Sequence, residues 1–206
     1  MSIAPETGEG LYAMVLAAGA ASRFGSAKQL VRIAGRPLLH NTVSRAVDVA
    51  GAATIVVLGA YASELAPLLR HTPATIVINR NWREGIGSSI RTGVGRLPAA
   101  CNGVMVVLAD QAAVTAEDLR RLVSAWKRQP EYVVAARYAG GVGVPAIFPR
   151  TRFGELAELR GDVGARRLLQ RNLDQLIRVP MESAALDIDT PEDLLGLDAQ
   201  QQNTSS

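Results

Sequence analysis

Two patterns of apolar and polar positions alternate along this chain. The first is a short, continuously apolar run, as found in strands that are buried on both faces. Five runs have this pattern: residues 12–17 (YAMVLA), 54–58 (TIVVL), 75–78 (TIVI), 104–108 (VMVVL) and 132–136 (YVVAA). The second pattern places apolar residues three and four positions apart, which is typical of amphipathic helices. Strands that alternate with helices predict an α/β fold with a doubly wound, mostly parallel sheet.

Helices are expected between these strands. They cover residues 37–50, 62–70, 87–97 and 115–129. The last of these has the clearest start, because Thr115 is a favourable N-cap residue and the acids Glu117 and Asp118 fall in the first turn.

The pattern changes after residue 137. Gly140, Gly141, Gly143 and Pro145 predict a turn-rich connection. The elements expected beyond it are helices near 150–159 and 163–172, a strand near 175–179, and a final helix over 187–197 that Thr190 caps. We expect one domain over residues 12–197, with flexible termini at 1–11 and 198–206.

The composition excludes several kinds of site and partner. Of the 206 residues, 48% are hydrophobic, which is enough for a buried core and excludes general disorder. One cysteine, Cys101, excludes an internal disulfide and a multi-thiolate zinc site. A net charge of +3 without long basic runs, and only 4% aromatic residues, argue against a nucleic-acid partner.

Neither a membrane partner nor export is expected. No apolar run approaches the roughly 20 residues of a membrane-spanning helix. Residues 1–10 contain acids and no basic stretch followed by an apolar one, so we expect no signal peptide and a cytoplasmic protein.

A glycine-rich loop follows the first predicted strand (LAAGAASRFGSAK, residues 16–28). In open α/β sheets, ligands bind at the carboxyl ends of strands, and glycines let backbone amides approach a phosphate. The loop matches neither the dinucleotide fingerprint, since no glycine lies in the required middle position between Gly19 and Gly25, nor the P-loop, since Lys28 does not directly follow Gly25.

This loop supplies two cations, Arg23 and Lys28, to a glycine-lined cradle. Lys28 is one of only two lysines in a chain that otherwise uses arginine, and a compact ammonium group suits phosphate oxygens. We favour a phosphate site over the alternative, a surface loop with two solvated cations.

Three aspartates are candidate ligands of Mg²⁺, which prefers carboxylate oxygens. Asp110 directly follows an apolar strand, and Asp187 and Asp189 alternate with Ile188, so both face the same way in an extended segment. The alternatives are that Asp110 forms a turn and that Asp189 complements the dipole of the last helix.

Two further segments open predicted helices with polar residues. Ser88 and Ser89 follow the flexible residues 84–87 and can hydrogen-bond to a base edge, or serve only as a cap. Asp162 is placed to cap a helix that carries Arg166 in its first turn.

Several motifs together resemble nucleotidyltransferases of the molybdenum-cofactor type. The motifs are LAAGAASRFGSAKQL followed by GRPLL (residues 16–30 and 35–39), NRNWREGIGSSIR (79–91), LADQ (108–111), GVGVPAIF (141–148), GDVGAR (161–166) and DIDTPEDL (187–194). Their order and spacing match over about residues 12–197. Within this group, the segment 79–91 resembles molybdenum cofactor cytidylyltransferases. The resemblance implies the Rossmann-like fold of nucleotide-diphospho-sugar transferases.

The resemblance also implies roles for particular residues. Arg23, Lys28 and Asp110 would be catalytic. The nucleotide would be bound by Leu16, Ala17, Ala18, Gly19, Ala20, Arg23, Lys28, Asn79, Gly85, Ser88 and Ser89. The acceptor would be bound by Gly143, Pro145, Gly161, Asp162 and Arg166. Asp110, Asp187 and Asp189 would hold Mg²⁺.

The implied reaction joins CMP from CTP to the terminal phosphate of molybdopterin, in its metal-free or molybdenum-loaded form, and releases pyrophosphate. A molybdoenzyme or chaperone would receive the product. Alternatives are a guanylyltransferase, a sugar- or polyol-phosphate nucleotidyltransferase, and a nucleotide-binding cofactor chaperone without catalysis. Ala18 stands where the guanylyl enzymes usually have glycine, which favours cytosine. Ala112 and Val144 replace the family's usual proline and histidine, which leaves the acceptor open.

Overall fold

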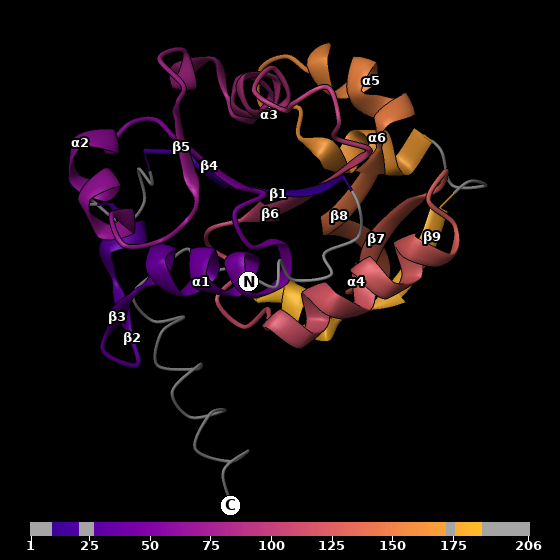
Figure 1. Cartoon of the computed structure of the whole chain (residues 1–206), viewed down its shortest axis with the longest axis horizontal. Coiled ribbons are helices and arrows are strands. Elements are labelled where there is room, and N and C mark those ends of the chain that lie inside the picture. Colours follow the sequence, from indigo (N-terminus) through magenta and orange to yellow (C-terminus); the bar gives the residue numbers. More distant parts are fainter. Residues whose placement is uncertain (1–9, 21–26, 172–175, 187–206) are drawn as a thin grey trace, which may run out of the picture.

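The computed structural model describes residues 10–20, 27–171 and 176–186. Seven strands form one sheet in the order β5-β4-β1-β6-β8-β7-β9 (Figure 1). Their bounds are β1 Leu11–Ala17, β4 Thr54–Leu58, β5 Thr75–Ile78, β6 Gly103–Leu108, β7 Val133–Tyr138, β8 Gly141–Pro149 and β9 Leu176–Pro180. The short strands β2 (Arg32–Ile33) and β3 (Arg36–Pro37) pair separately.

The sheet is parallel except at β8, which runs antiparallel to both of its neighbours. This confirms the predicted α/β fold with a mostly parallel sheet. The turn-rich connection predicted around residues 140–145 is wrong, because only Ala139 and Gly140 turn and a nine-residue strand follows. Both residues have positive φ, as a two-residue hairpin turn of type I′ requires. Glycine and proline inside the strand concealed it in the sequence.

Helices cover both faces of the sheet (Figure 1). On one face α1 (Leu38–Ala50) and α4 (Ala116–Arg128) share an apolar cluster with Val15, Val56 and Val107. On the other, α3 (Ile86–Val94), α5 (Phe153–Ala157) and α6 (Ala165–Arg171) share a second cluster with Met14, Val57 and Val106. Alternate residues of the central strands therefore enter different cores, which is why these strands have no polar face.

The remaining helical segments are short. α2 (Ala62–Leu65) passes into the 3-10 helix η2 (Ala66–Leu69), where Pro67 interrupts the expected helix. The described residues also contain the 3-10 helices η1 (Lys28–Leu30), η3 (Trp82–Glu84), η4 (Arg150–Arg152) and η6 (Glu182–Ala185). The predicted final helix over 187–197 and the predicted flexible termini lie outside the described residues, except for residues 10 and 11.

Thr115 caps α4, as its position predicts. The backbone N–H of Asp118 donates to Thr115 Oγ1 at 3.1 Å, and the N–H of Thr115 donates to Asp118 Oδ2 at 2.9 Å. Ser183 Oγ also donates to Asp118 Oδ2 at 2.8 Å, so the same carboxylate joins α4 to η6. By contrast, Asp162 does not cap α6, because that helix begins three residues later, at Ala165.

The register of the central strands brings three loops together. Leu16 of β1 lies beside Val57 of β4 and Leu108 of β6. The loops that follow these parallel strands therefore leave the sheet at one edge. In a doubly wound sheet, this edge is where a ligand binds.

Candidate active site

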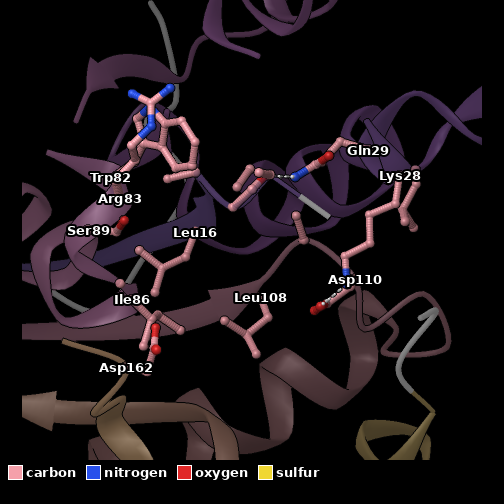
Figure 2. A pocket seen from close by; sticks show the side chains of 17 residues that line it. Leu16, Lys28, Gln29, Trp82, Arg83, Ile86, Ser89, Leu108, Asp110 and Asp162 are labelled. Atoms are coloured by element: carbon pink, nitrogen blue, oxygen red, sulfur yellow. Dashed lines mark hydrogen bonds and ion pairs between the residues drawn. The ribbon is translucent and has the colours of Figure 1, made fainter. Parts of the chain in front are cut away.

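A cavity of about 430 Å³ opens at the carboxyl ends of β1 and β6 (Figure 2). Its residues come from the glycine-rich loop and η1, from β6 and the residues after it, from η3 and the start of α3, and from the loop before α6. They are Leu16, Ala17, Ala18, Gly19, Ala20, Lys28, Gln29, Leu38, Trp82, Arg83, Gly85, Ile86, Ser89, Leu108, Ala109, Asp110 and Asp162. Leu16 and Leu108 lie in the middle of the view, between two polar ends (Figure 2).

One end of the cavity carries an ion pair. Lys28 Nζ lies 2.6 Å from Asp110 Oδ2. Asp110 Oδ1 is buried and has no hydrogen-bond partner among the described residues. A buried carboxylate oxygen without a donor costs free energy unless a ligand satisfies it. This oxygen is therefore suited to bind a divalent cation, in agreement with the prediction that Asp110 is a ligand of Mg²⁺.

The first part of the glycine-rich loop is held by other elements. Gln29 Nε2 donates to Gly19 O at 3.2 Å, Ala60 N–H donates to Ala18 O at 3.1 Å, and Tyr61 Oη donates to Ala20 O at 3.1 Å. Three backbone carbonyls of this part of the loop are thereby occupied, and the loop is fixed in place before a ligand binds.

The opposite end is formed by η3 and α3. The Arg83 guanidinium lies 4.3 Å from the centre of the Trp82 ring, and both side chains line the cavity. A Cβ atom on Gly59 would lie 2.7 Å from Trp82 Cβ and 2.8 Å from Ala18 Cβ. A side chain at position 59 would therefore collide with both residues, so glycine is needed there.

The two predicted serines have different surroundings. Ser89 lines the cavity, whereas Ser88 does not. Asn79 Nδ2 donates to Ser88 Oγ at 2.8 Å and to Ser89 Oγ at 3.0 Å, and Asn79 is buried. Ser88 Oγ is also within hydrogen-bonding distance of the carbonyls of Asn81 and Gly85. Asn79 and Ser88 thus hold the turn before α3 and leave Ser89 to face the cavity.

Of the residues predicted to bind the acceptor, only Asp162 lines this cavity. Gly143 and Pro145 lie within β8, where Val144 O accepts hydrogen bonds from Gln111 Nε2 at 2.9 Å and from Tyr138 Oη at 3.2 Å. The exposed Arg166 approaches Gly141 instead, with Nη2 3.7 Å from a Cβ built there.

Several predicted residues cannot be placed. Arg23, Asp187 and Asp189 lie outside the described residues. Within residues 10–20, 27–171 and 176–186, no group of three or more His, Cys, Asp or Glu side chains is arranged to hold a metal. In the same part of the chain, no helix has the length and apolar character to cross a membrane.

The sequence interpretation missed seven cavity residues: Gln29, Leu38, Trp82, Arg83, Ile86, Leu108 and Ala109. Trp82 offered a signal, since it is one of only two tryptophans and lies inside the motif 79–91. Cys101 is buried, and burial raises the pKa of its thiol. It is therefore a core residue rather than a nucleophile.

Comparisons with known proteins identify the family of this chain. A family model described as "MobA-like NTP transferase domain" matches residues 13–176. Nicotine blue oxidoreductase of Paenarthrobacter nicotinovorans is 29% identical over 196 residues, covering 89% of this chain and 94% of that protein.

Solved structures give the same picture. The crystal structure of Rv0371c from Mycobacterium tuberculosis is 30% identical and has a TM-score of 0.79, with 93% of this chain and 98% of that chain covered. A second structure of Rv0371c, in complex with manganese, has a TM-score of 0.73 and covers 92% of this chain and 97% of that one. The motifs, the fold and the family match together show that this chain belongs to the MobA-like NTP transferase family and is a nucleotidyltransferase of that type.

Proposed function

We propose that this nucleotidyltransferase transfers CMP from CTP to the terminal phosphate of molybdopterin and releases pyrophosphate. One observation carries the proposal: a single cavity has the Lys28–Asp110 pair at one end and Trp82 with Ser89 at the other. A nucleoside triphosphate needs cations beside its phosphates and a flat, partly polar surface beside its base. The phosphates would lie beside Lys28 and Asp110, with Arg23 as a second cation, and the base beside Trp82 and Ser89.

The width of the base end favours a pyrimidine. Ala18 and Trp82 both line the cavity, and the Ala18 methyl group occupies space that glycine at position 18 would leave open. Ser89 can donate to and accept from the polar edge of cytosine. The alternative is that the same site transfers GMP from GTP to the same acceptor.

A divalent cation would be held by Asp110, together with Asp187 and, as a further candidate, Asp189. The unpartnered Asp110 Oδ1 supports a metal at this position, and the manganese complex of Rv0371c supports the use of a divalent cation in this family. When bound, Mg²⁺ would neutralise charge on the phosphates and favour pyrophosphate as a leaving group. Lys28 would stabilise the same negative charge as a fixed cation.

No protein nucleophile is needed. An oxygen of the acceptor phosphate, already anionic near neutral pH, would form a bond to the α-phosphorus while the bond from that phosphorus to pyrophosphate breaks. The protein would position the two phosphates. Asp162, Gly161, Arg166, Gly143 and Pro145 are the proposed acceptor contacts, and Val144 in place of the family's usual histidine leaves that side less polar.

Pyrophosphate release with each of the four common ribonucleoside triphosphates, with and without molybdopterin, tests the proposal. We expect release only with molybdopterin, and kcat/KM for CTP at least about tenfold above that for GTP, which corresponds to about 1.4 kcal/mol. Guanylylated product in excess would overturn the cytidylyl assignment. Absence of release with every triphosphate would overturn the molybdopterin assignment. If nucleotides nevertheless bind, that result would favour the cofactor-chaperone alternative.

A further inference from the structure

Arg91 joins two neighbouring segments that both contribute residues to the cavity. Its side chain leaves α3, donates from Nη1 to the carbonyl of Leu159, and forms an ion pair at 2.7 Å from Nη2 to Glu84 Oε2. Glu84 ends η3, directly before Gly85, whereas Leu159 lies just before Asp162. One guanidinium therefore holds the segment 82–89 (the nucleotide segment) to the loop 159–162 (the acceptor loop).

The backbones of the two segments are also in direct contact. Gly87 N–H donates to Gly161 O at 2.9 Å. A Cβ atom on Gly85 would lie 2.4 Å from Gly161 C and 2.5 Å from Asp162 Oδ1, and Gly85 has a φ of +104°. Because packed backbones transmit a shift rather than absorb it, a movement of the nucleotide segment displaces the acceptor loop.

Both segments reach the cavity, but Arg91 itself does not. Gly85, Ile86 and Ser89 of the first segment and Asp162 of the second line it, whereas Arg91 is absent from the lining. Arg91 is therefore expected to affect a ligand through the segments that it holds, by its contacts with Glu84 and the Leu159 carbonyl.

An arginine is required for this arrangement. Its planar guanidinium presents donors in two directions at once, so one side chain can satisfy both a backbone carbonyl and a carboxylate. A lysine at position 91 would keep the charge beside Glu84, but a single ammonium on a flexible stem does not hold both partners in one fixed plane.

We propose that Arg91 is a positioning residue that transmits occupancy of the nucleotide site to the acceptor loop. This inference rests on the proposed function, in which the nucleotide lies beside Gly85 and Ser89 and the acceptor beside Asp162. Binding of the nucleotide against the nucleotide segment orders the acceptor loop through Arg91. The binding site for the acceptor is then already formed when the acceptor arrives. The expected consequence is that the acceptor binds more tightly after the nucleotide.

Hydrogen exchange of the whole chain, with and without saturating CTP and Mg²⁺, tests the coupling without requiring turnover. In the wild type, we expect CTP to slow exchange both in peptides covering 82–90 and in peptides covering 159–164. In Arg91→Met, slowing at 82–90 should persist while slowing at 159–164 falls to less than a third. Arg91→Lys should give an intermediate result.

Arg120→Met is the matched control. Arg120 pairs with Glu117 at 3.5 Å on the exposed surface of α4, so this variant removes an ion pair that joins no loop to the cavity. It should behave as the wild type. If the Arg91→Met variant does not fold, the hydrogen-exchange test is made with Arg91→Lys, because lysine retains the charge and most of the volume of the arginine side chain.

Steady-state kinetics supply a second readout. Arg91→Met should raise the KM for the acceptor about tenfold while kcat changes less than about threefold. General destabilisation of the protein would not raise KM while leaving kcat nearly unchanged. Undiminished slowing at 159–164 in both Arg91 variants would overturn the inference, as would CTP binding that leaves 159–164 unchanged in the wild type. A wild type that binds no nucleotide by calorimetry would refute the proposed function itself, and the inference with it.

Discussion

Lys28 Nζ lies 2.6 Å from Asp110 Oδ2, although 82 positions separate the two residues in the chain. Their side chains are only 15% and 22% exposed, so water screens the pair less than it would a surface pair. The pair neutralises both charges at the end of the cavity where the phosphates are proposed to bind. A triphosphate would attract the ammonium, which would release Asp110 Oδ2 for a cation.

Replacing Lys28 by alanine should reduce turnover by about 10²–10³-fold, the scale expected when one preorganised charge is removed from a transition state. The measurement is kcat for pyrophosphate release with CTP and the acceptor. Lys127→Ala is the matched control, since Lys127 is the other lysine of the chain and is exposed on α4. A loss of less than threefold in Lys28→Ala would contradict the phosphate role.

Asp110→Asn should abolish the activity that Mg²⁺ or Mn²⁺ supports and leave the fold intact, because the residue lies after the end of β6 rather than in the core. The amide keeps the shape of the side chain but loses the charge that a divalent cation requires. Titration with Mn²⁺ in the presence of CTP, followed by calorimetry, measures the affinity directly. Asp48→Asn, on the exposed side of α1, is the control. Unchanged metal affinity in Asp110→Asn would exclude Asp110 as a ligand.

Ala18→Gly should weaken the preference for CTP over GTP. Removing the Ala18 methyl group, which lines the cavity together with Trp82, leaves more room beside the base, so that a purine is accepted more readily. We expect the ratio of kcat/KM values to fall at least about threefold, a change of roughly 0.6 kcal/mol. Competition between equal concentrations of the two nucleotides measures this ratio. A ratio that stays the same would show that Ala18 does not select the base.

Asp118→Asn should destabilise the protein in a way that depends on pH. Burial alone would raise the pKa of Asp118, but the hydrogen bonds from Thr115, Arg121 and Ser183 outweigh it and hold the pKa below its usual value of 3.8. A lowered folded-state pKa gives stability that is present above the unfolded-state pKa and is lost as the pH falls through the folded-state value.

The difference in unfolding free energy between wild type and Asp118→Asn should therefore be about 1–2 kcal/mol near neutral pH, the size of a lost helix cap. It should shrink as the pH falls below 3.8. Urea denaturation at several pH values measures the difference. Glu117→Gln, on the exposed side of the same turn, should show no comparable loss. A difference that stays constant down to the lowest pH would contradict the role given to the charge.

The alternation of apolar runs with helical periods was enough to predict the α/β class and the mostly parallel sheet. The runs 54–58 and 75–78 coincide with β4 and β5. β4 is buried on both faces and leaves an unambiguous apolar signature, whereas β5 is an apolar strand at the edge of the sheet. Thr115 and Asp118 likewise predicted the start of α4, since capping is a local interaction. The family followed from the motifs together.

Only the tertiary structure decided how distant residues meet. β8 was missed because glycine and proline weaken a strand signal that pairing with β6 and β7 restores. Nothing local distinguishes Ser88 from Ser89. Asn79 donates to both, but only the Ser88 hydroxyl contacts the carbonyls of Asn81 and Gly85, and only Ser89 lines the cavity. The pairing of Lys28 with Asp110 and the bridge from Arg91 to Leu159 depend on strand register and loop packing. The sequence alone determines which side chains are available, and the folded chain determines which of them share a site.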